Sequence, residues 1–470
     1  MEDKKTKKFS KLEIAIFGIY IGLFIIIGMT LLIYQPPTAV GNLTNPPDEF
    51  SRFMVPRFIF ERGILPTAND VEVRIPGYGN SYALFPVVAY VFQAIGMRML
   101  SIFNNDADKL IYYARAVNLT MGVITQVMIY LVSRELFKKR AFRWFFCFFI
   151  MFLPQHLFIF TYVNTDAMSS MACSIISLAL VYIYKKKINL KFSVLLSLGC
   201  ALCILSYYSA YGYVLMAVLL CIIYFIQSKD GKITYDYKNA LKWAVIISAM
   251  VVILSAWFFI RNAKLYGGDF LGLETSRLMR IGYGAPEVNP ELHPSFKERG
   301  YSYPKFLWMI ATNHFLLKMI KSYICCYGSM IIDADPFTYG FYLVTYFVGL
   351  VGYVARSISK LKNKESGLKK VLINAVLILG SFIPVFLITY YAYSSDYQWQ
   401  GRYILSAVIP LSFFVTRGIC FLLNKTKMKE KYINIIMGIM CAICVICEII
   451  VVYVMSLYRF LEPGAFYYLV

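Results

Sequence analysis

The chain contains 470 residues, of which 59% are hydrophobic, and its mean hydropathy is +0.61. Apolar stretches of about 20 residues, the length that crosses a bilayer core, recur along it without strict alternation, which excludes a water-soluble fold and argues against a membrane β-barrel. The formal net charge of +21 fits basic residues in short cytoplasmic loops that meet anionic lipid better than it fits nucleic-acid binding.

The first predicted element is a membrane helix over residues 14–34. It follows a group of lysines, namely Lys4, Lys5, Lys7, Lys8 and Lys11. No small-residue cleavage pattern precedes residues 34–37, so we expect this helix to be retained and not removed as a signal peptide. The lysines place the N-terminus in the cytoplasm by the positive-inside rule. The long polar segment that follows, 35–110, is therefore expected outside.

The next apolar stretch, 82–103, is long enough to span a membrane but contains Pro86 and Arg98. The span that follows it, 114–131, ends in the strongly basic segment 134–140, which marks the cytoplasmic side. The 82–103 stretch must then begin and end outside. We predict a juxtamembrane or re-entrant helix there.

Further spans follow at regular intervals, and with the first two they make about eleven. They are predicted at 144–161, 167–184, 192–210, 211–227, 241–260, 338–355, 371–392, 404–423 and 433–456. The sequence thus predicts an all-α polytopic membrane protein, with residues 1–470 as a single domain and no separate soluble domain. A second large external loop, 261–337, contains aromatic-rich stretches such as 301–308 that suit a helix lying on the membrane surface.

Every polar cluster that could carry chemistry falls on the expected outer face. Asp48 and Glu49 follow Pro46 and Pro47, which restrict the backbone and help to hold two carboxylates just beyond the first helix. A positioned carboxylate can act as a general base towards an attacking hydroxyl. A solvated acidic turn is the alternative interpretation.

Asn164 and Asp166 lie in a short loop between an outward and an inward span. Asp166 could serve as the N-cap of the following helix, because aspartate is a favoured residue there. An amide and a carboxylate at a helix entrance could equally bind sugar hydroxyls. The two roles are compatible.

Gln400, Arg402 and Tyr403 open a helix on the outer face. A guanidinium beside unpaired backbone N–H groups is suited to binding phosphate, although Arg and Tyr also serve as interfacial anchors at this depth. Arg261 lies at the outer end of its own helix, close to Tyr266, and is a weaker phosphate candidate because an arginine there also satisfies the helix dipole.

No metal site is predicted. His156, His293 and His314 have no metal-ligand spacing, and the eleven cysteines lie mostly inside apolar stretches. No cofactor is implied, and the sequence neither requires nor excludes a divalent cation. Glu448, inside the last span, is costly there and is therefore a functional candidate whose role stays open.

The order of these clusters resembles the GT-C superfamily of membrane glycosyltransferases, which includes protein O-mannosyltransferases and the lipid A aminoarabinose transferase. The features shared with that superfamily are the acidic pair after the first helix, residues 115–119 and residues 164–166. A bacterial family of polytopic membrane proteins related to them is closer still. Its recurring features are similar to residues 46–49, 261–262, 266–267, 322–328 and 400–403. The resemblance covers nearly the whole chain and rests on the order and spacing of the motifs.

The resemblance implies an inverting transferase that moves a sugar from a polyprenyl-phosphate donor to an acceptor hydroxyl on the extracytoplasmic face of the cell membrane. The acceptor would be a cell-envelope glycan, a lipid-linked glycan or a protein. By carry-over, Asp48 would be the general base and Glu49 would orient acceptor or donor. The implied substrate-binding residues are Asn164, Asp166, Arg261, Gln400, Arg402 and Tyr403, with Arg402 and Arg261 on the phosphate. Further candidates are Arg52, Arg115 and Tyr266.

Two departures from the family pattern bear on the acceptor. The family usually has a histidine soon after the acidic pair, whereas residues 50–53 offer Arg52 instead. We also expect no large soluble C-terminal domain of the kind with which oligosaccharyltransferases hold protein acceptors, so a glycan or lipid-linked acceptor is more expected than a protein.

Alternative functions stay open from the sequence. A polysaccharide polymerase would share the outer-face site and the lipid-linked substrate. A transporter or flippase of lipid-linked sugars would usually show inverted repeats and midplane polar groups, and only Glu448 fits that description. A structural scaffold would not need acids and arginines gathered on one face.

Overall fold

The computed structural model describes residues 10–37, 45–229, 232–363 and 367–461. Four of the N-terminal lysines and part of the first external segment, residues 38–44, lie outside this range. Helices dominate the described chain, and the strands form two short antiparallel hairpins. The hairpins are β1 (Ile226–Lys229) with β2 (Lys232–Tyr235), and β3 (Cys326–Tyr327) with β4 (Ile332–Asp333).

Eight helical stretches in the described chain are long and apolar enough to cross a membrane. Each coincides with a predicted span, which confirms the all-α membrane architecture. They are built on α1 (Lys11–Tyr34), α4 (Leu110–Leu136), α7 (Asp166–Lys186), α10 (Tyr237–Leu265), α14 (Pro336–Lys362), α15 (Leu368–Ser394), α16 (Val408–Lys425) and α17 (Glu430–Ile449). The 3₁₀-helix η6 (Gly401–Ala407) leads into α16, and the π-helix η7 (Ile450–Ser456) continues α17.

The other three predicted spans are shorter helices. The 144–161 stretch is α5 (Arg140–Met151) followed by α6 (Pro154–Phe158), and the break precedes Pro154, which has no N–H to continue the α5 ladder. The 192–210 and 211–227 stretches are α8 (Leu190–Ile204) and α9 (Tyr211–Tyr224). Eight of the eleven predicted spans are thus complete membrane-length helices.

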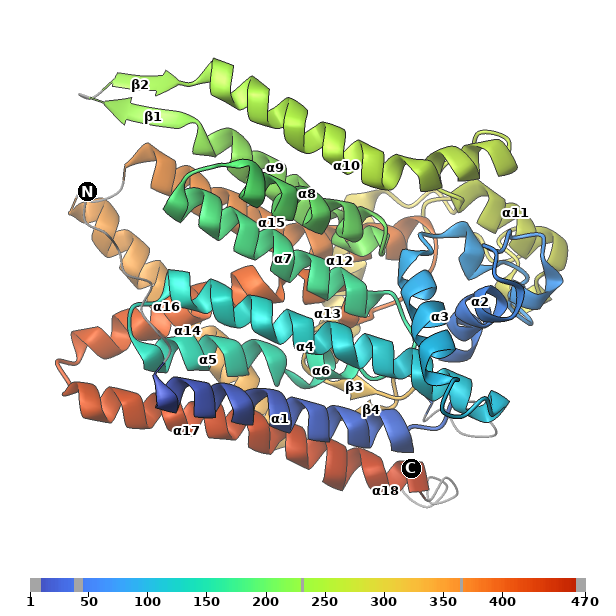
Figure 1. Ribbon diagram of the computed structural model, residues 1–470, viewed down its shortest axis with the longest axis horizontal. Helices are drawn as coiled ribbons and strands as arrows, with labels where there is room; N and C mark the ends of the chain where they lie inside the picture. The colour runs from blue at the N-terminus through green and yellow to red at the C-terminus, as the bar shows by residue number, and fades with distance from the viewer. Residues whose placement is uncertain (1–9, 38–44, 230–231, 364–366, 462–470) are drawn as a thin grey trace.

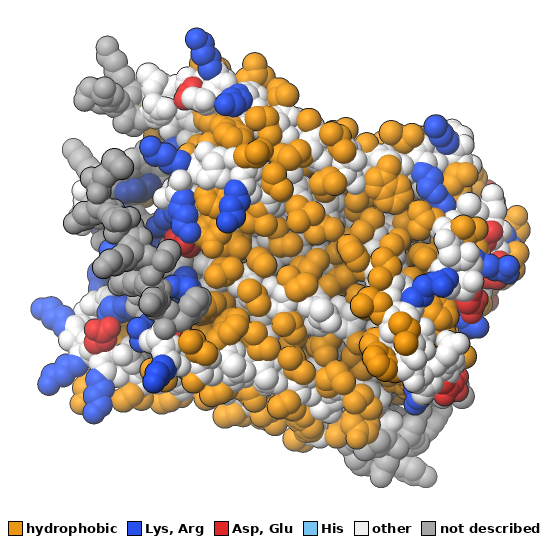
Figure 2. Space-filling model, in the orientation of Figure 1, with side chains coloured by type: hydrophobic (Ala, Val, Ile, Leu, Met, Phe, Trp, Pro, Cys, Tyr) orange, Lys and Arg blue, Asp and Glu red, His pale blue; other side chains and the backbone are white. Residues whose placement is uncertain are grey.

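The long helices run roughly along the long axis of the molecule, with the start of α1 at one end (Figure 1). The opposite end is covered by α2 (Glu49–Arg62), α3 (Val88–Leu100) and α11 (Leu273–Tyr283). We call these three helices and the loop segments next to them, 63–87 and 266–288, the cap. The helix predicted within 82–103 is α3, and it belongs to the cap. Figure 2 shows a broad hydrophobic surface between the two ends, as a membrane protein requires.

The two large loops pack against each other to form this cap. The Asn262 side chain donates to the Leu84 carbonyl at 2.8 Å, and the Ala285 N–H donates to the Gly77 carbonyl at 2.7 Å. Gly79 has φ +80° and faces the backbone of Tyr283, where a Cβ would come within 2.5 Å. These contacts join segments about 200 residues apart and give the site a rigid support.

Two short helices of the second loop approach the bundle beneath the cap. They are α12 (Tyr303–Thr312) and α13 (Phe315–Ile324). The Ser322 hydroxyl of α13 donates to the Trp399 carbonyl at 3.1 Å and accepts from the Gly401 N–H at 2.8 Å. A Cβ on Gly401 would lie 2.1 Å from the Tyr323 nitrogen. Glycine is therefore required for η6 to start against α13.

Candidate functional site

Asp48 stands at the entrance of α2 in a strained conformation. Its φ of 61° and ψ of 5° lie in the left-handed region, which aspartate tolerates better than most residues. One of its oxygens accepts from Arg402 Nη2 at 2.7 Å and lies 4.0 Å from Arg52 Nη2. The Asp48 side chain is 40% exposed, whereas both guanidinium groups are almost completely buried. An accessible carboxylate is thus held between two buried cations.

The charge state of Asp48 follows from two opposing effects. Burial raises the pKa of this carboxyl, but the guanidinium groups of Arg402 and Arg52 outweigh burial and bring the pKa below the ordinary aspartate value. Asp48 is therefore ionised at neutral pH. A catalytic base works best when its pKa lies near the working pH, and the lowered pKa of Asp48 lies well below that. Asp48 is therefore a weak base as long as both arginines remain in place.

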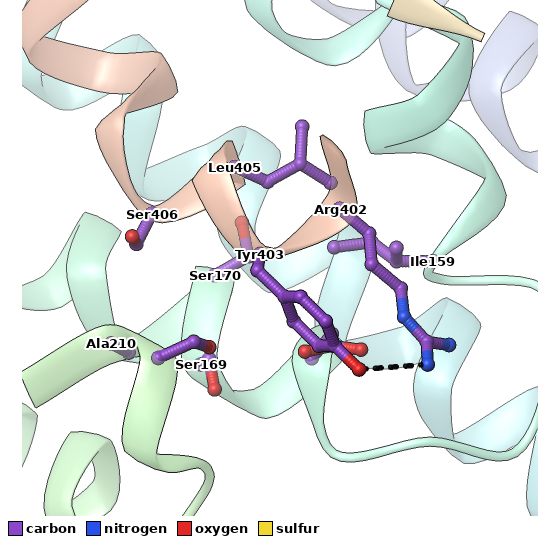
Figure 3. A pocket seen from close by; sticks show the side chains of 10 residues that line it. Ile159, Ser169, Ser170, Ala210, Arg402, Tyr403, Leu405 and Ser406 are labelled. Atoms are coloured by element: carbon purple, nitrogen blue, oxygen red, sulfur yellow. Dashed lines mark hydrogen bonds between the residues drawn. The ribbon is translucent and has the colours of Figure 1, made fainter. Parts of the chain in front are cut away.

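Arg402 is fixed by the aromatic residues around it. Its Nη1 donates to the Tyr162 hydroxyl at 3.1 Å, and its Nη2 donates to the Tyr403 hydroxyl at 3.3 Å, the bond drawn in Figure 3. Its Nε is buried and has no hydrogen-bond partner among the described residues. The guanidinium thus keeps one N–H free for a further acceptor.

Arg52 is enclosed by a polar contact on one side and rings on the other. Its Nη1 donates to Thr165 Oγ1 at 3.2 Å, and its guanidinium lies 4.5 Å from the Tyr82 ring centroid and 5.4 Å from that of Tyr207. Tyr207 in turn stacks on Tyr403 at 5.9 Å. Tyr82, Tyr207 and Tyr403 form one aromatic wall beside the Asp48 carboxylate.

Asn164 and Asp166, at the start of α7, have different surroundings in the structure. Asn164 Oδ1 accepts from the Ala167 N–H at 2.9 Å, and its Nδ2 donates to the carbonyls of Ile159 and Tyr162. Asn164, and not Asp166, is therefore the residue whose side chain caps α7. Because its amide is occupied by backbone groups, the geometry does not favour the sugar contact expected for Asn164.

Asp166, the first residue of α7, instead lines a small cavity. The cavity has a volume of about 10 Å³ and is shown in Figure 3. Its polar lining consists of Asp166, Ser169, Ser170, Ser209, Arg402, Tyr403 and Ser406. Asp166 Oδ2 is buried, and no residue of the described ranges forms a hydrogen bond with it. The structure thus brings Asp166, Arg402 and Tyr403 together around one polar cavity.

Glu49 does not face this cavity. It is completely buried, and it forms a bidentate ion pair with Arg115 through Nε at 2.8 Å and Nη2 at 2.5 Å. Glu49 also accepts from the Val163 N–H at 2.7 Å, and Arg115 Nη1 donates to the carbonyls of Leu32 and Gln35. Because Glu49 is completely buried and both its oxygens are paired, the geometry argues against its expected orienting role. The pair clamps the end of α1 to α2 and α4.

Arg261 and Tyr266 support the cap. Arg261 Nη2 donates to the carbonyls of Leu65 and Pro66, and the Tyr266 hydroxyl accepts from the Ala68 N–H at 2.9 Å. Among the interactions of the described residues, none joins Arg261 to the Asp48–Arg402 pair. The geometry therefore favours Arg402 over Arg261 for phosphate.

Gln400 precedes Gly401 and has a buried, unpartnered Oε1. It is not part of the cavity lining. Its expected substrate contact stays a prediction.

The described residues contain no group of three His, Cys, Asp or Glu side chains that could hold a metal ion. His156 lies in the core, with Nδ1 at 2.9 Å from the Ile150 carbonyl and Nε2 at 2.6 Å from Ser170 Oγ. Glu448 is also buried, and Tyr327 supplies the partner that could not be identified from the sequence, at 2.8 Å from Oε1.

Several residues of the site were not predicted from the sequence. Tyr82, Tyr162, Tyr207 and Ser406 contact or line it, yet aromatic residues make up 17% of the chain and a single tyrosine carries no signal. Tyr207 lies near the end of the expected outward span 192–210, which is the one local indication that it lies near the outer face.

Residues 38–273 match the model of a family of predicted membrane proteins, DUF2142. The chain belongs to this family. The match includes the two parts of the site that lie in the first half of the chain. These are Asp48 with Arg52, and the loop before α7. No curated protein sequence shows significant similarity to the chain.

The structure is similar to that of an archaeal oligosaccharyltransferase. The Archaeoglobus fulgidus enzyme AglB, in complex with an inhibitory peptide and a dolichol-phosphate, matches with 15% identity and a TM-score of 0.54 over 96% of this chain and 56% of that one. The A. fulgidus oligosaccharyltransferase tethered to an acceptor peptide with the NVT sequon matches with 14% identity and a TM-score of 0.51, over 94% and 55% of the two chains. The GT-C fold expected from the sequence is confirmed, and the chain spans a little over half the length of these proteins.

Proposed function

We propose that the protein is a membrane glycosyltransferase that moves a sugar from a polyprenyl-phosphate donor to an acceptor hydroxyl. The observation that carries this proposal is the Asp48–Arg402 pair, because it places a carboxylate and a guanidinium 2.7 Å apart beside a polar cavity. The GT-C fold supports the proposal, and so does the dolichol-phosphate bound to the archaeal neighbour.

Arg402 would bind the donor phosphate. A guanidinium is a geometrically specific partner for phosphate oxygens, and Arg402 Nη2 at present pairs with Asp48. A donor phosphate at Arg402 would compete for that nitrogen and add negative charge beside Asp48. Both changes raise the pKa of Asp48, so donor binding would turn a weak base into a stronger one.

Transfer would then proceed in one displacement. Asp48 takes the proton of the acceptor hydroxyl, whose oxygen bonds to the anomeric carbon while the bond from that carbon to the phosphate oxygen breaks. The polyprenyl phosphate leaves with one additional negative charge. Arg402, and Arg52 next to it, stabilise that charge as it develops. Attack opposite the leaving group inverts the anomeric centre.

The site would lie on the extracytoplasmic face. Basic side chains predominate at the end of the molecule where α1 starts, whereas basic and acidic side chains are mixed at the cap end (Figure 2). The positive-inside rule assigns the first end to the cytoplasm. Asp48 and the start of α7 belong to the opposite end.

The direct test is a cryo-EM map of the protein in nanodiscs with added polyprenyl phosphate, together with a transfer assay using polyprenyl-phosphate hexoses. We expect phosphate density in contact with Arg402 beside Asp48. Arg98→Ala, which removes another arginine of the cap end, should leave this density unchanged. Lipid density that crosses the midplane, or none near Asp48, would support a transporter instead.

A further inference from the structure

The loop between α6 and α7, residues 159–165, is held by buried side-chain amides. Gln93 Nε2, from α3, donates to the Asn164 carbonyl at 3.0 Å, and Asn118 Nδ2, from α4, donates to the Tyr162 carbonyl at 2.6 Å. Asn164 Nδ2 donates to the same Tyr162 carbonyl at 2.9 Å. All three amide residues are completely buried. Because these bonds satisfy loop carbonyls that no helix pairs, they give the loop a defined shape.

Two hydroxyls of this loop reach the two arginines of the site. The Tyr162 hydroxyl accepts from Arg402 Nη1 at 3.1 Å, and Thr165 Oγ1 accepts from Arg52 Nη1 at 3.2 Å. Tyr162 is 0% exposed and Thr165 is 2% exposed, so neither bond competes with bulk water. Both arginines are thus held at the same guanidinium nitrogen by side chains of one short loop.

The remaining donors of the two guanidinium groups are also arranged alike. Arg402 Nη2 lies 2.7 Å and Arg52 Nη2 lies 4.0 Å from the same Asp48 oxygen, and both Nε atoms are buried without a hydrogen-bond partner in the described part of the chain. Nε and Nη2 form the edge with which a guanidinium holds two oxygens at once, as Arg115 does with Glu49. Two such edges therefore meet at Asp48, each with an unused Nε–H.

A phosphate group supplies more acceptors for these edges than Asp48 does. Asp48 presents one oxygen to both arginines, whereas a phosphodiester has two free oxygens and a phosphomonoester has three. The third oxygen of the monoester is the one released when the bond to the anomeric carbon breaks, and its charge would develop beside the two guanidinium groups. The orientation of both edges therefore matters most for the leaving phosphate.

We propose that Tyr162 and Thr165 are positioning residues, whose hydroxyls turn the Nε–Nη2 edges of Arg402 and Arg52 towards one shared phosphate group. The proposal rests on the proposed function, since it assigns how the donor phosphate is held. Without its hydroxyl partner, Nη1 is a buried donor with no acceptor, which is costly. The guanidinium then turns Nη1 towards Asp48, the carboxylate already beside it, and the edge no longer faces the phosphate.

The test compares the affinities of the protein in nanodiscs for polyprenyl phosphate and for polyprenol, because their ratio isolates the contribution of the phosphate. We expect Tyr162→Phe and Thr165→Val each to reduce this ratio about 3- to 10-fold, the effect of one hydrogen bond of ordinary strength. Thr165→Ser, which keeps the hydroxyl, should restore most of the ratio lost in Thr165→Val. Tyr20→Phe is the matched control and should leave the ratio unchanged, since Tyr20 is a completely buried tyrosine whose hydroxyl donates to the Cys147 carbonyl, away from the site.

Double variants show through which arginine each hydroxyl acts. In an Arg402→Ala background, Tyr162→Phe should have no further effect, because its partner is gone, whereas Thr165→Val should keep its full effect. An Arg52→Ala background should give the reverse. A hydroxyl that merely stabilises the fold would act equally in both backgrounds.

The outcomes separate these roles from the proposed function. If polyprenyl phosphate binds the wild-type protein no more tightly than polyprenol, the proposed function and the positioning roles both fail. If the phosphate contributes to binding but its contribution is unchanged in Tyr162→Phe or in Thr165→Val, the donor site stands and the positioning proposal is wrong. Effects that persist equally in both arginine backgrounds would also overturn it. If Tyr162→Phe does not fold, the comparison of Thr165→Val with Thr165→Ser decides.

Discussion

Asp48→Asn removes the proposed base while it keeps the shape of the site. Asparagine tolerates the left-handed backbone at φ 61° as aspartate does. Its side-chain oxygen can still accept from Arg402 Nη2. It cannot take a proton from an acceptor hydroxyl, so we expect the transfer rate to fall by about 10²- to 10⁴-fold, the usual contribution of a general base.

The effect of Asp48→Asn on stability should be much smaller. Breaking a fully buried ion pair costs about 3–5 kcal/mol, whereas an exposed pair contributes about 1 kcal/mol or less. The Asp48 side chain is 40% exposed, whereas its arginine partners are only 1% exposed. We therefore expect a loss of about 1–2 kcal/mol, which leaves the protein folded and inserted.

The pH dependence of the wild type provides a second check on Asp48. Because Arg402 and Arg52 outweigh burial and lower its pKa, Asp48 is more favourably charged in the folded than in the unfolded state. The stability that its ion pairs contribute is fully present above the ordinary aspartate pKa. It is lost as the pH falls through the lowered pKa of the folded protein. Asp48→Asn should remove this part of the acid dependence.

The assay is transfer of a labelled hexose from polyprenyl phosphate to acceptor in proteoliposomes, with thermal unfolding measured in parallel. Glu61→Gln is the matched control, because Glu61 is an exposed acid of α2 that pairs with Arg57 away from the site. A turnover of Asp48→Asn within about threefold of the wild type would refute the base assignment, since general bases contribute far more than this.

Arg402→Ala should raise the apparent KM for the donor at least about tenfold while it leaves that for the acceptor nearly unchanged; equal donor affinity in kinetic titrations would argue against the phosphate role. Glu49→Gln should destabilise the protein by about 3–5 kcal/mol, because it leaves the buried Arg115 without its counter-charge, and thermal unfolding tests this. Glu448→Gln should preserve thermal stability, whereas Glu448→Leu should lower it. The Tyr327 hydroxyl lies within hydrogen-bond distance of the Pro154 carbonyl and of Glu448 Oε1 but has only one hydrogen. If that hydrogen goes to Pro154, the bond between Tyr327 and residue 448 needs a donor at position 448, which glutamine supplies and leucine does not. Equal losses in the two Glu448 variants would contradict this hydrogen-bond count.

The membrane helices could be predicted because their signal is local. The apolar run of 14–34 sets the extent of α1, and lysines and arginines between runs set the alternation of direction. The basic segment 134–140 led to the prediction that 82–103 is not a span, and α3 is not among the membrane-length helices of the described chain. Helix breaks were harder, since Pro154 interrupts a run whose overall length is sufficient for a span.

The site depended on contacts that no local pattern contains. Glu49 meets Arg115, 66 residues away, and Asp48 meets Arg402, 354 residues away. From the sequence, Asp48 and Glu49 were adjacent acids with similar prospects. In the folded protein Asp48 is partly exposed beside a polar cavity, whereas Glu49 is buried in the core. Only the three-dimensional arrangement distinguishes them.

The Glu49–Arg115 clamp also has a consequence for biogenesis. Glu49 is synthesised well before Arg115, so the carboxylate lacks its counter-ion until α4 has emerged, and α4 enters the bilayer with an unneutralised arginine near its end. Burying either charge in the protein interior is costly until the ion pair between Glu49 and Arg115 has formed. We expect the first loop to close onto the bundle after α4 is inserted, which makes this ion pair a checkpoint in the assembly order of the membrane protein.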